Sequence, residues 1–483
     1  MLKVKTRAGN TYAWDNNVGV FIPMTPALSA IIDSRPYPNS VSDEDILFYN
    51  KWMKKWKNIR PNTNLHVIPK KVHTSDIRPL VMRNGLGSMA LGITEDCNFR
   101  CKYCAYSGNY EYERIHTDKY MHYSTAQKAI DNYFLLINEG KRFHPTRKPI
   151  IGFYGGEPLL NFNLIKKCVE YIQSKYNDYC TEYSITSNGS LLSKKKADWL
   201  MNHDFLLLVS IDGPKEEHDR NRVYLNGEGT FRDVMKNVDR IMDAGYKRIF
   251  SSLVYDWKSD LFKLNEFFDK TNIPPLQSAA IVNKHAGCKY YNQFTEEDQI
   301  FYLKRLEEAK RYYYNMIKKN RSKRPSFFDH IFNFAPKNDL CSAVSISPFV
   351  PQMPFTRACI PGRRIFVDTD GDYHLCERIA PTHPIGNADD GLDYEKICEI
   401  INTYHSCLDR CTYCKVSRMC TICYPVFESK AGMSCTTSKL CNKVELDKRD
   451  AFAESLSLAE KLYPDLFFET DFKYKNVRNW WRK

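Results

Sequence analysis

Three cysteines in the string EDCNFRCKYCAYSG have a spacing that can hold an iron-sulfur cluster, namely Cys97, Cys101 and Cys104. Three thiolates on one short loop occupy three corners of a four-iron cluster, so the fourth iron stays open to a substrate or cofactor. Zinc is the alternative, but zinc sites usually combine two CxxC pairs, and no further Cys or His follows here until His116. The CxxxCxxC spacing therefore favours a cluster with one open iron.

Most of the other cysteines follow residue 340. No stretch of the chain is apolar enough to span a bilayer, and the first ten residues lack the apolar core of a signal peptide. We therefore expect a cytoplasmic protein, in which thiols stay reduced and grouped cysteines bind metal rather than form disulfides. Because two CxxC pairs also fit a zinc knuckle, a zinc-stabilised nucleic-acid-binding protein is the alternative from a different class.

The charge distribution argues against that alternative. The net charge is +13, but 26% of the residues are charged and acids are interspersed among the bases, without the concentrated basic face of nucleic-acid binders. A positive surface also suits an acidic peptide or an anionic cofactor. We expect neither a nucleic-acid nor a membrane partner.

The elements that must position the cysteine loop form a repeating strand-helix pattern from residue 89 onward. Six short apolar runs alternate with helical patterns, which predicts an α/β fold with a parallel sheet covered by helices. The predicted strands are 89–93, 150–154, 183–186, 205–211, 248–254 and 276–282; the predicted helices are 124–137, 161–176, 193–201, 231–244, 261–269 and 295–319. Right-handed crossovers would curl this sheet into a barrel or a part-barrel.

Four polar loops should then meet at one rim, because the carboxyl ends of parallel strands lie on the same edge. The cysteine loop follows the first strand and GGEP (155–158) follows the second. SNG (187–189) follows the third, and SIDGP (210–214) closes the fourth. Each loop alone is a weak signal, but their order behind CxxxCxxC is a strong one.

A CxxxCxxC loop with aromatic Tyr103 before the last cysteine, followed by GGEP, resembles the radical S-adenosylmethionine (SAM) superfamily. The resemblance implies that the open iron chelates SAM and that an electron from the cluster cleaves it to a 5'-deoxyadenosyl radical, which abstracts hydrogen from carbon. It also implies that Glu157 accepts a hydrogen bond from the SAM ammonium. The implied cofactor-binding residues are Tyr103, Gly155, Gly156, Glu157, Pro158, Ser187, Asn188, Ser210 and Asp212.

The segment SIDGPKEEHDRNRVYLNGEGTF and the later cysteines resemble the branch of this superfamily that carries a C-terminal auxiliary-cluster (SPASM) domain. The resemblance implies three 4Fe-4S clusters, one that binds SAM and two auxiliary ones. The first auxiliary cluster would use Cys359, Cys376 and Cys423, with Cys341 as candidate fourth ligand. The second would use Cys411, Cys414, Cys420 and Cys441, with Cys435 as a rival to the last. Cys420 and Cys423 are separated by two residues, where the family commonly has three.

The strings CAYSGNYEYERIH and CIPGRRIFVDTDGDYHLCERI resemble maturases of ribosomally made peptides that join a cysteine sulfur to an unactivated carbon. The partners implied are a cysteine-containing precursor peptide and an external one-electron reductant of the flavodoxin or ferredoxin type. Glu377, beside Cys376, would be the catalytic base, and a salt bridge to Arg378 or Arg364 is the alternative. The residues Tyr106, Tyr110, Arg114 and His116 would line the peptide channel. Maturases that form carbon-carbon crosslinks, or formylglycine in sulfatases, are the runner-up.

The predicted domains follow these patterns. Residues 1–85 form a small α+β module with strands at 3–6, 11–14 and 18–22, which is either a leader-peptide recognition module or an extension packed on the barrel. Residues 86–290 form the partial (β/α)6 barrel, 291–335 a helical bridge and 336–450 the cluster domain. Residues 451–483 form a C-terminal helix and a basic aromatic tail.

Overall fold

The fold is described from a computed structural model of the chain. It describes residues 1–16, 20–24, 41–43, 46–47, 49–51, 54, 71–282, 288–319, 326–332, 359, 361–407, 414–420, 422–429, 432–433 and 438–462. No helix in these ranges is long and apolar enough to cross a membrane.

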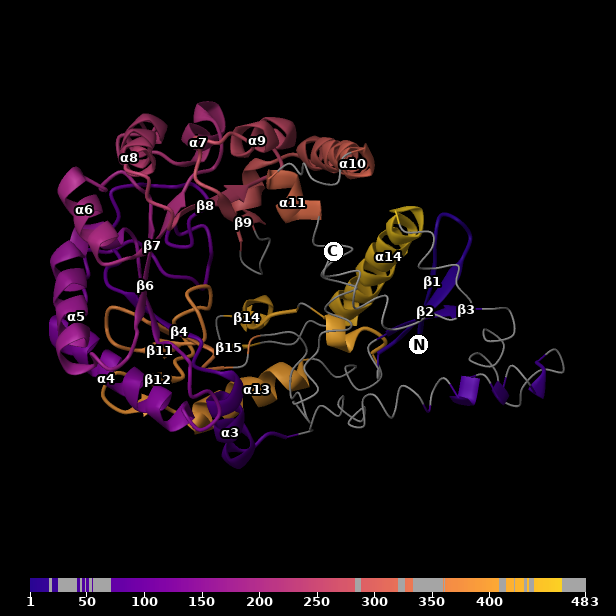
Figure 1. Cartoon of the computed structure of the whole chain (residues 1–483), viewed down its shortest axis with the longest axis horizontal. Coiled ribbons are helices and arrows are strands. Elements are labelled where there is room, and N and C mark those ends of the chain that lie inside the picture. Colours follow the sequence, from indigo (N-terminus) through magenta and orange to yellow (C-terminus); the bar gives the residue numbers. More distant parts are fainter. Residues whose placement is uncertain are drawn as a thin grey trace.

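An eight-stranded sheet in the order β11-β10-β4-β5-β6-β7-β8-β9 organises the fold (Figure 1). The six predicted strands are confirmed as β4 (Ser88–Gly92), β5 (Ile150–Tyr154), β6 (Glu182–Ser187), β7 (Leu206–Ser210), β8 (Ile249–Tyr255) and β9 (Leu276–Ile281). Each pairs in parallel with the next along the chain. The result is an α/β fold with a mainly parallel central sheet, as the alternating pattern predicts.

Burial alternates along strands β5 to β8, with every second residue buried and the residues between them only half-buried. Since successive side chains of a strand point to opposite faces, one face packs on helices and the other faces a less filled space. Figure 1 shows helices α4 to α9 on the outer face of the arc of strands. The inner face is thus left to form a site.

The predicted covering helices are confirmed with small shifts at their ends. They are α4 (Tyr123–Gly140), α5 (Phe162–Lys175), α6 (Lys194–Asn202), α8 (Phe231–Asp243), α9 (Leu261–Phe268) and α10 (Glu296–Lys319). In α8, the buried residues Val234, Val238 and Ile241 share one face at helical spacing, which explains why this segment is a helix. Two short helices complete this layer: α7 (Lys215–Asn221), which the sequence pattern did not predict, and α11 (Ser326–Phe332), which lies in the segment predicted as a helical bridge.

The sheet continues into the cysteine-rich part of the chain. Strand β10 (Arg364–Val367) pairs in parallel with β4, and β11 (Tyr373–His374) pairs antiparallel with β10. Helix α13 (Tyr394–Ser406) packs against α3 (Thr74–Asn84), whose Ile77 and Val81 belong to the core of the sheet. Two-residue strands β12 (Gly386–Asn387), β13 (Gly391–Leu392), β14 (Glu428–Ser429) and β15 (Gly432–Met433) complete the region. The region after residue 360 therefore extends the sheet, which its sequence did not predict.

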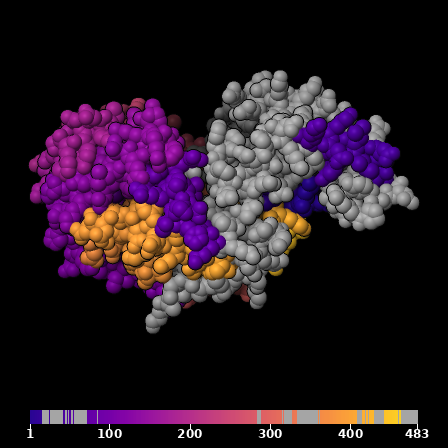
Figure 2. Space-filling model, turned by 90° about the horizontal axis from the view of Figure 1, so that it is seen from below, coloured from indigo at the N-terminus to yellow at the C-terminus, as the bar shows by residue number. Residues whose placement is uncertain are grey.

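The N-terminal sheet forms as predicted, from β1 (Leu2–Lys5), β2 (Thr11–Asp15) and β3 (Val20–Met24). It packs on the C-terminal helix α14 (Ser438–Leu462), where the Tyr12 hydroxyl donates to Glu460 at 2.7 Å and Trp14 lies 5.6 Å from Phe452 between ring centroids. Figure 2 shows N-terminal residues at the opposite end of the molecule from the magenta part of the chain. Residues 25–40 of the predicted N-terminal module and the predicted tail after residue 462 lie outside the described residues.

Candidate functional site

The cysteine loop follows β4 and is held by the end of α7 and the segment after it. The backbone N–H groups of Arg100 and Lys102 donate to the carbonyls of Val223 (2.8 Å) and Asn221 (3.0 Å). The Arg100 guanidinium turns back and donates to the Phe99 carbonyl at 2.8 Å. These bonds fix the loop as a rigid turn that carries all three thiols.

Each thiol of the loop accepts an N–H group. Cys97 Sγ accepts from the backbone of Phe99 (3.4 Å) and from Asn188 Nδ2 (3.9 Å), and Cys104 Sγ accepts from the backbone of Tyr106 (3.4 Å). Cys101 Sγ lies 3.8 Å from Arg222 Nη1. Donors aimed at sulfur stabilise thiolates and help to set the potential of a cluster bound to them.

The three thiols are neighbours, but they are not arranged around a single ion. Burial raises the pKa of Cys97, and the thiolates of Cys101 and Cys104 raise it further. Burial likewise raises the pKa of Cys101 to about 12. Within the described part of the chain, no three His, Cys, Asp or Glu side chains lie close enough to hold one metal ion.

The GGEP turn clasps the residues that lead into this loop. The N–H groups of Gly156 and Glu157 donate to the carbonyls of Thr94 (2.8 Å) and Asp96 (2.9 Å). A Cβ at Gly155 would lie 2.2 Å from the Thr94 carbonyl oxygen, and one at Gly156 would lie 2.1 Å from that of Asp96. Glycine is required at both positions because two backbones meet there. These two glycines, predicted to bind the cofactor, thus let the GGEP backbone approach the residues that precede Cys97.

Glu157 is fully buried and joins two of the predicted loops. Its Oε1 accepts from the Ser187 hydroxyl (2.9 Å) and from the Leu159 backbone (3.0 Å), while its Oε2 accepts from the Asn188 backbone (2.7 Å). Burial raises the pKa of Glu157 to about 6. The Glu157 carboxylate thus joins the SNG loop to the GGEP turn through hydrogen bonds. Its expected bond to the SAM ammonium stays a prediction.

Asp212 is buried next to the cysteine loop. Its Oδ2 accepts from Arg222 Nε at 2.9 Å and from the Tyr103 hydroxyl, and its Oδ1 accepts from the Val254 backbone at 3.0 Å. Burial raises the pKa of Tyr103 well above its ordinary value, so the phenol stays protonated and donates. Asp212 therefore positions Tyr103 and Arg222. Sequence reasoning missed Arg222, whose only signal is its place in the quoted segment after SIDGP.

A cavity of about 280 Å³ lies on the inner face of the sheet. It is lined by half-buried residues at strand ends, such as Tyr154, Ser252 and Val254. Ten of the predicted site residues also line it, namely Cys97, Cys101, Tyr103, Cys104, Gly155, Gly156, Ser187, Asn188, Ser210 and Glu377. Glu157, Pro158 and Asp212 are not among its described lining residues, and they lie buried. The four predicted loops do converge.

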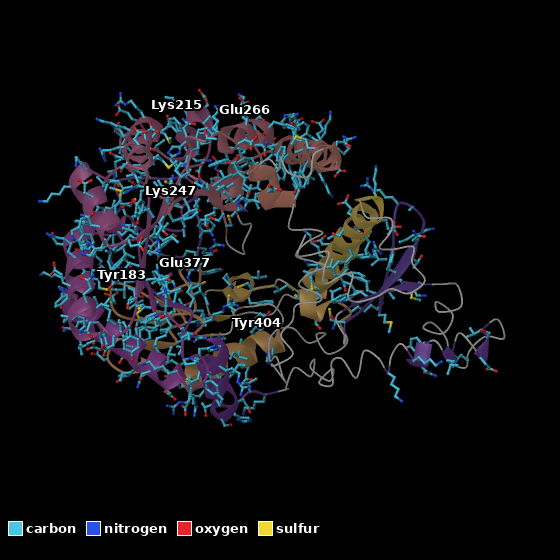
Figure 3. The ribbon with its side chains drawn as sticks, viewed as in Figure 1. Tyr183, Lys215, Lys247, Glu266, Glu377 and Tyr404 are labelled. Carbon is cyan, nitrogen blue, oxygen red and sulfur yellow. The ribbon has the colours of Figure 1, made fainter. Side chains whose placement is uncertain are left out.

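Glu377 reaches this cavity from the cysteine-rich region. Figure 3 labels it near the strands, on the side away from α5 and α6. Its Oε1 forms an ion pair with Arg364 at 3.0 Å. A salt bridge to Arg364 was one of the alternatives to a catalytic role. Its Oε2 is buried and has no hydrogen-bond partner among the described residues. The carboxylate therefore has one oxygen held and one oxygen available.

Cys376, Cys359 and Cys423 lie close together beside Glu377. Burial raises the pKa of Cys376 to about 12, and the charges of Glu377, Cys423 and Cys359 add to the shift. The Tyr424 hydroxyl donates to the Cys359 carbonyl at 3.3 Å. The three described members of the first predicted auxiliary set are thus neighbours of one another and of Glu377.

The other predicted ligands are only partly described. Cys341, Cys411 and Cys435 lie outside the described residues. Cys414 packs beside the N-terminal sheet, Cys420 is buried after the turn 417–419, and Cys441 lies in the first turn of α14. The second auxiliary set therefore stays a prediction.

The four residues predicted to line a peptide channel divide into three groups. Tyr106 and Tyr110 line the inner cavity. Arg114 is buried, donates to the Ile379 carbonyl at 2.9 Å and lies over the Phe366 ring. His116 stacks on Tyr106 and lines a different cavity on the outside of the cysteine loop.

Comparison with known proteins agrees with this geometry. Residues 91–256 match the model of the Radical SAM superfamily. An uncharacterized protein of Methanocaldococcus jannaschii is 28% identical over 64% of this chain and 91% of its own length. The cysteine-type anaerobic sulfatase-maturating enzyme of Clostridium novyi is 28% identical over 38% of this chain and 48% of its own. The radical SAM cyclopropyl synthase TigE of Paramaledivibacter caminithermalis is 23% identical over 44% of each chain. The chain thus spans about half the length of these last two relatives.

The fold has a counterpart among solved structures. The structure of anSMEcpe with bound AdoMet and a Cp18Cys peptide superposes with a TM-score of 0.54 and 19% identity, over 77% of this chain and 99% of that one. At this identity the likeness concerns the fold. The segment that matches the radical SAM superfamily, residues 91–256, contains the cysteine loop and the GGEP, SNG and SIDGP loops, and the match implies a 4Fe-4S cluster and SAM as cofactors.

Proposed function

We propose that the protein is a radical SAM peptide maturase that joins a cysteine sulfur of a precursor peptide to a carbon of the same peptide. The sheet and its six βα units would be the partial (β/α)6 barrel, and the region from Cys359 to Cys441 the SPASM domain. The proposed domains are the N-terminal module 1–85, the barrel 86–290, the helical bridge 291–335, the cluster domain 336–450 and the C-terminal segment 451–483.

One observation carries the proposal. Glu377, the neighbour of Cys376, lines the same cavity as Cys97, Cys101 and Cys104. The predicted auxiliary ligand Cys376 is therefore the sequence neighbour of a residue that lines the predicted SAM cavity. A substrate held in that cavity would lie beside both a source of radicals and an acceptor of electrons, and thioether formation needs both.

When bound, the cluster and SAM supply a carbon-centred radical that removes one hydrogen atom from the substrate. Glu377 would take the proton of the substrate thiol on its free Oε2, while Arg364 holds Oε1. As the sulfur-carbon bond forms, the substrate also loses one electron, and Cys359, Cys376 and Cys423 would hold the cluster that receives it. The substrate thus loses a hydrogen atom, a proton and an electron, which amounts to two hydrogens per crosslink.

The runner-up within the same class has comparable support. The C. novyi relative is named as a sulfatase-maturating enzyme and TigE as a cyclopropyl synthase, and neither name implies a thioether. Formylglycine formation, or closure of a carbon-carbon bond, would use the same radical step and the same removal of an electron. The fate of the thiols and the mass change together separate these reactions, because oxidation of a cysteine to formylglycine also consumes a thiol but replaces its sulfur with oxygen.

The test is a single-turnover assay on the anaerobically reconstituted protein with a cysteine-containing precursor, SAM and dithionite. Intact-mass analysis should show loss of two hydrogens per crosslink, and alkylation should show that one thiol is consumed each time. Two hydrogens lost with every thiol still alkylated would support a carbon-carbon crosslink instead. Matched substrates with Cys replaced by Ala serve as controls.

The metal content tests the alternative of a zinc-stabilised nucleic-acid-binding protein. Three four-iron clusters correspond to about twelve iron and twelve sulfide per chain and to a brown protein. A colourless protein that contains zinc after anaerobic purification would overturn the assignment of all three clusters.

A further inference from the structure

A second cavity, of about 750 Å³, lies on the outer side of the cysteine loop. Its lining shares only Cys101 and Tyr106 with the inner cavity. The loop is therefore a thin wall, with the inner cavity on one side and the outer cavity on the other. Cys101, a predicted cluster ligand, forms part of that wall on both sides.

The outer cavity is basic. Its described lining includes Arg100, Lys102 and Lys289 and contains no Asp or Glu. Lys102 and Lys289 are exposed, and neither has an acidic partner among the described residues. Ile115 also belongs to the lining and is 59% exposed. A positive rim around an exposed apolar side chain is a surface suited to an acidic protein.

The cavity is held in shape by the segment after β9. The backbone N–H of Lys289 donates to the Asn109 carbonyl at 2.7 Å, and the Tyr290 hydroxyl donates to Asp256 at 2.7 Å. The Asn109 side chain in turn donates to the Lys102 carbonyl at 2.6 Å. The two exposed lysines thus come from separate segments that are tied together, which gives their charges a fixed arrangement.

We propose that this outer cavity is the docking site of an acidic one-electron carrier protein, and that the electron enters through the Cys101 side of the loop. The carrier loses one electron and the cluster held by Cys97, Cys101 and Cys104 gains it, with no proton transferred. The proposal rests on the assignment of that loop as a radical SAM site. It does not depend on which product the enzyme forms.

The neighbouring geometry explains why a protein, and not the peptide substrate, fits this side. The peptide must reach the inner cavity, where Glu377 and the thiols meet, and the loop wall separates that cavity from the outer one. An electron does not need an open path, because it can cross the wall through Cys101. Weak redox complexes bury little surface and depend on charge for their association rate.

The experiment measures binding of an acidic flavodoxin to the reconstituted protein by biolayer interferometry at low and at physiological ionic strength. The variant Lys102→Glu/Lys289→Glu should weaken Kd at least about tenfold at low salt, and the difference should shrink as salt screens the charges. The single variant Lys289→Glu should show part of the effect. Because Lys289 is exposed and is remote in sequence from Cys97, Cys101 and Cys104, the iron content of Lys289→Glu should equal that of the wild type.

The control is Lys236→Glu, which makes the same charge change on the exposed face of α8. Cleavage of SAM driven by flavodoxin should slow in Lys289→Glu, while cleavage driven by dithionite should stay within about twofold, since the small reductant needs no docking surface. Both readouts are taken without a peptide, so they can fail independently of the thioether assay.

Three results would overturn the proposal. The first is no saturable binding of flavodoxin to the wild-type protein at low salt. The second is an equal loss of affinity in Lys236→Glu and in the double variant. The third is that the double variant keeps its affinity for flavodoxin but loses affinity for the precursor peptide, which would make the outer cavity a peptide site.

Discussion

Arg222 Nη1 lies 3.8 Å from Cys101 Sγ, so a buried guanidinium points at a predicted cluster ligand. The same side chain donates through Nε to Asp212 at 2.9 Å, which keeps it in place. Among the described donors to the three thiols, this one alone carries a full charge.

Loss of this charge should lower the reduction potential of the cluster, because a cationic N–H donor stabilises the reduced, more negative state. We expect Arg222→Gln to move the midpoint to a more negative value in an EPR-monitored redox titration. Removing one partner of a buried ion pair should also cost roughly 3 to 5 kcal/mol of unfolding free energy. Arg220→Gln is the control, since Arg220 pairs with buried Asp256 at 2.7 Å. Arg220 is not among the described donors to the three thiols. A potential that shifts equally in both variants would show a general loss of structure.

Substitution of Gly155 should separate the GGEP turn from the cysteine loop. A Cβ there would meet the Thr94 carbonyl at 2.2 Å, and the backbone φ is +137°. We expect Gly155→Ala to lose about 2 to 4 kcal/mol of unfolding free energy, from strain and overpacking together, and to bind less iron after reconstitution. Gly245→Ala isolates the backbone strain, because φ is +74° there and nothing lies within 4 Å of the added Cβ. Equal iron content and stability in the two variants would contradict the predicted clash.

His218 should make the protein less stable in acid. Its Nδ1 accepts from the Asp212 backbone at 3.3 Å, so the ring must be neutral, and burial lowers its pKa to about 3. Between pH 6.5 and pH 3 the unfolded chain binds more protons at this site than the folded protein does. The stabilisation is therefore complete above pH 6.5 and is lost as the pH falls, by at most about 1.4 kcal/mol per unit.

Urea unfolding at pH 5, 6, 7 and 8 measures this dependence. His218→Gln should reduce the slope of unfolding free energy against pH below 6.5. The exposed His122, at the start of α4, provides the matched variant His122→Gln, which should keep the wild-type slope. Identical slopes in all three proteins would exclude His218 as the cause.

Glu377→Gln removes the proposed base but keeps a hydrogen-bond acceptor for Arg364. The amide oxygen can still accept from Arg364, but no proton can be taken from the substrate thiol. We expect the rate of crosslink formation to fall about 10²- to 10⁴-fold, while SAM cleavage continues. Quantifying 5'-deoxyadenosine and crosslinked peptide in one assay separates the two steps. Parallel losses of both products would instead make Glu377 a residue that shapes the cavity.

Much of the sheet and its rim could be predicted from the sequence. Strands β4 to β9 are apolar runs of regular length between helical patterns, so local periodicity specifies them. The loops that follow them converge because parallel strands end at one edge. Ser187, Asn188 and Ser210 line the inner cavity for that reason.

Other features depend on contacts that no local pattern records. Strand β10 is four residues long, in a region rich in glycine, proline and cysteine, and it is defined by its partner β4. The sequence does not show that the Glu157 carboxylate accepts hydrogen bonds from Ser187 and Asn188, which come from a different loop. The role of Arg222 likewise depends on its contacts with Asp212 and Cys101, which precede it in the sequence by 10 and 121 residues.

The pairing of β10 with β4 has a consequence for synthesis of the chain. Strand β4 emerges from the ribosome long before β10 is made, so one edge of the nascent sheet has no partner during that time. An unpaired edge of this kind can recruit another nascent chain, which would make yield sensitive to translation speed and to chaperones. The cysteine-rich region thus completes the sheet, and truncation before Arg364 would leave the edge of β4 open to aggregation.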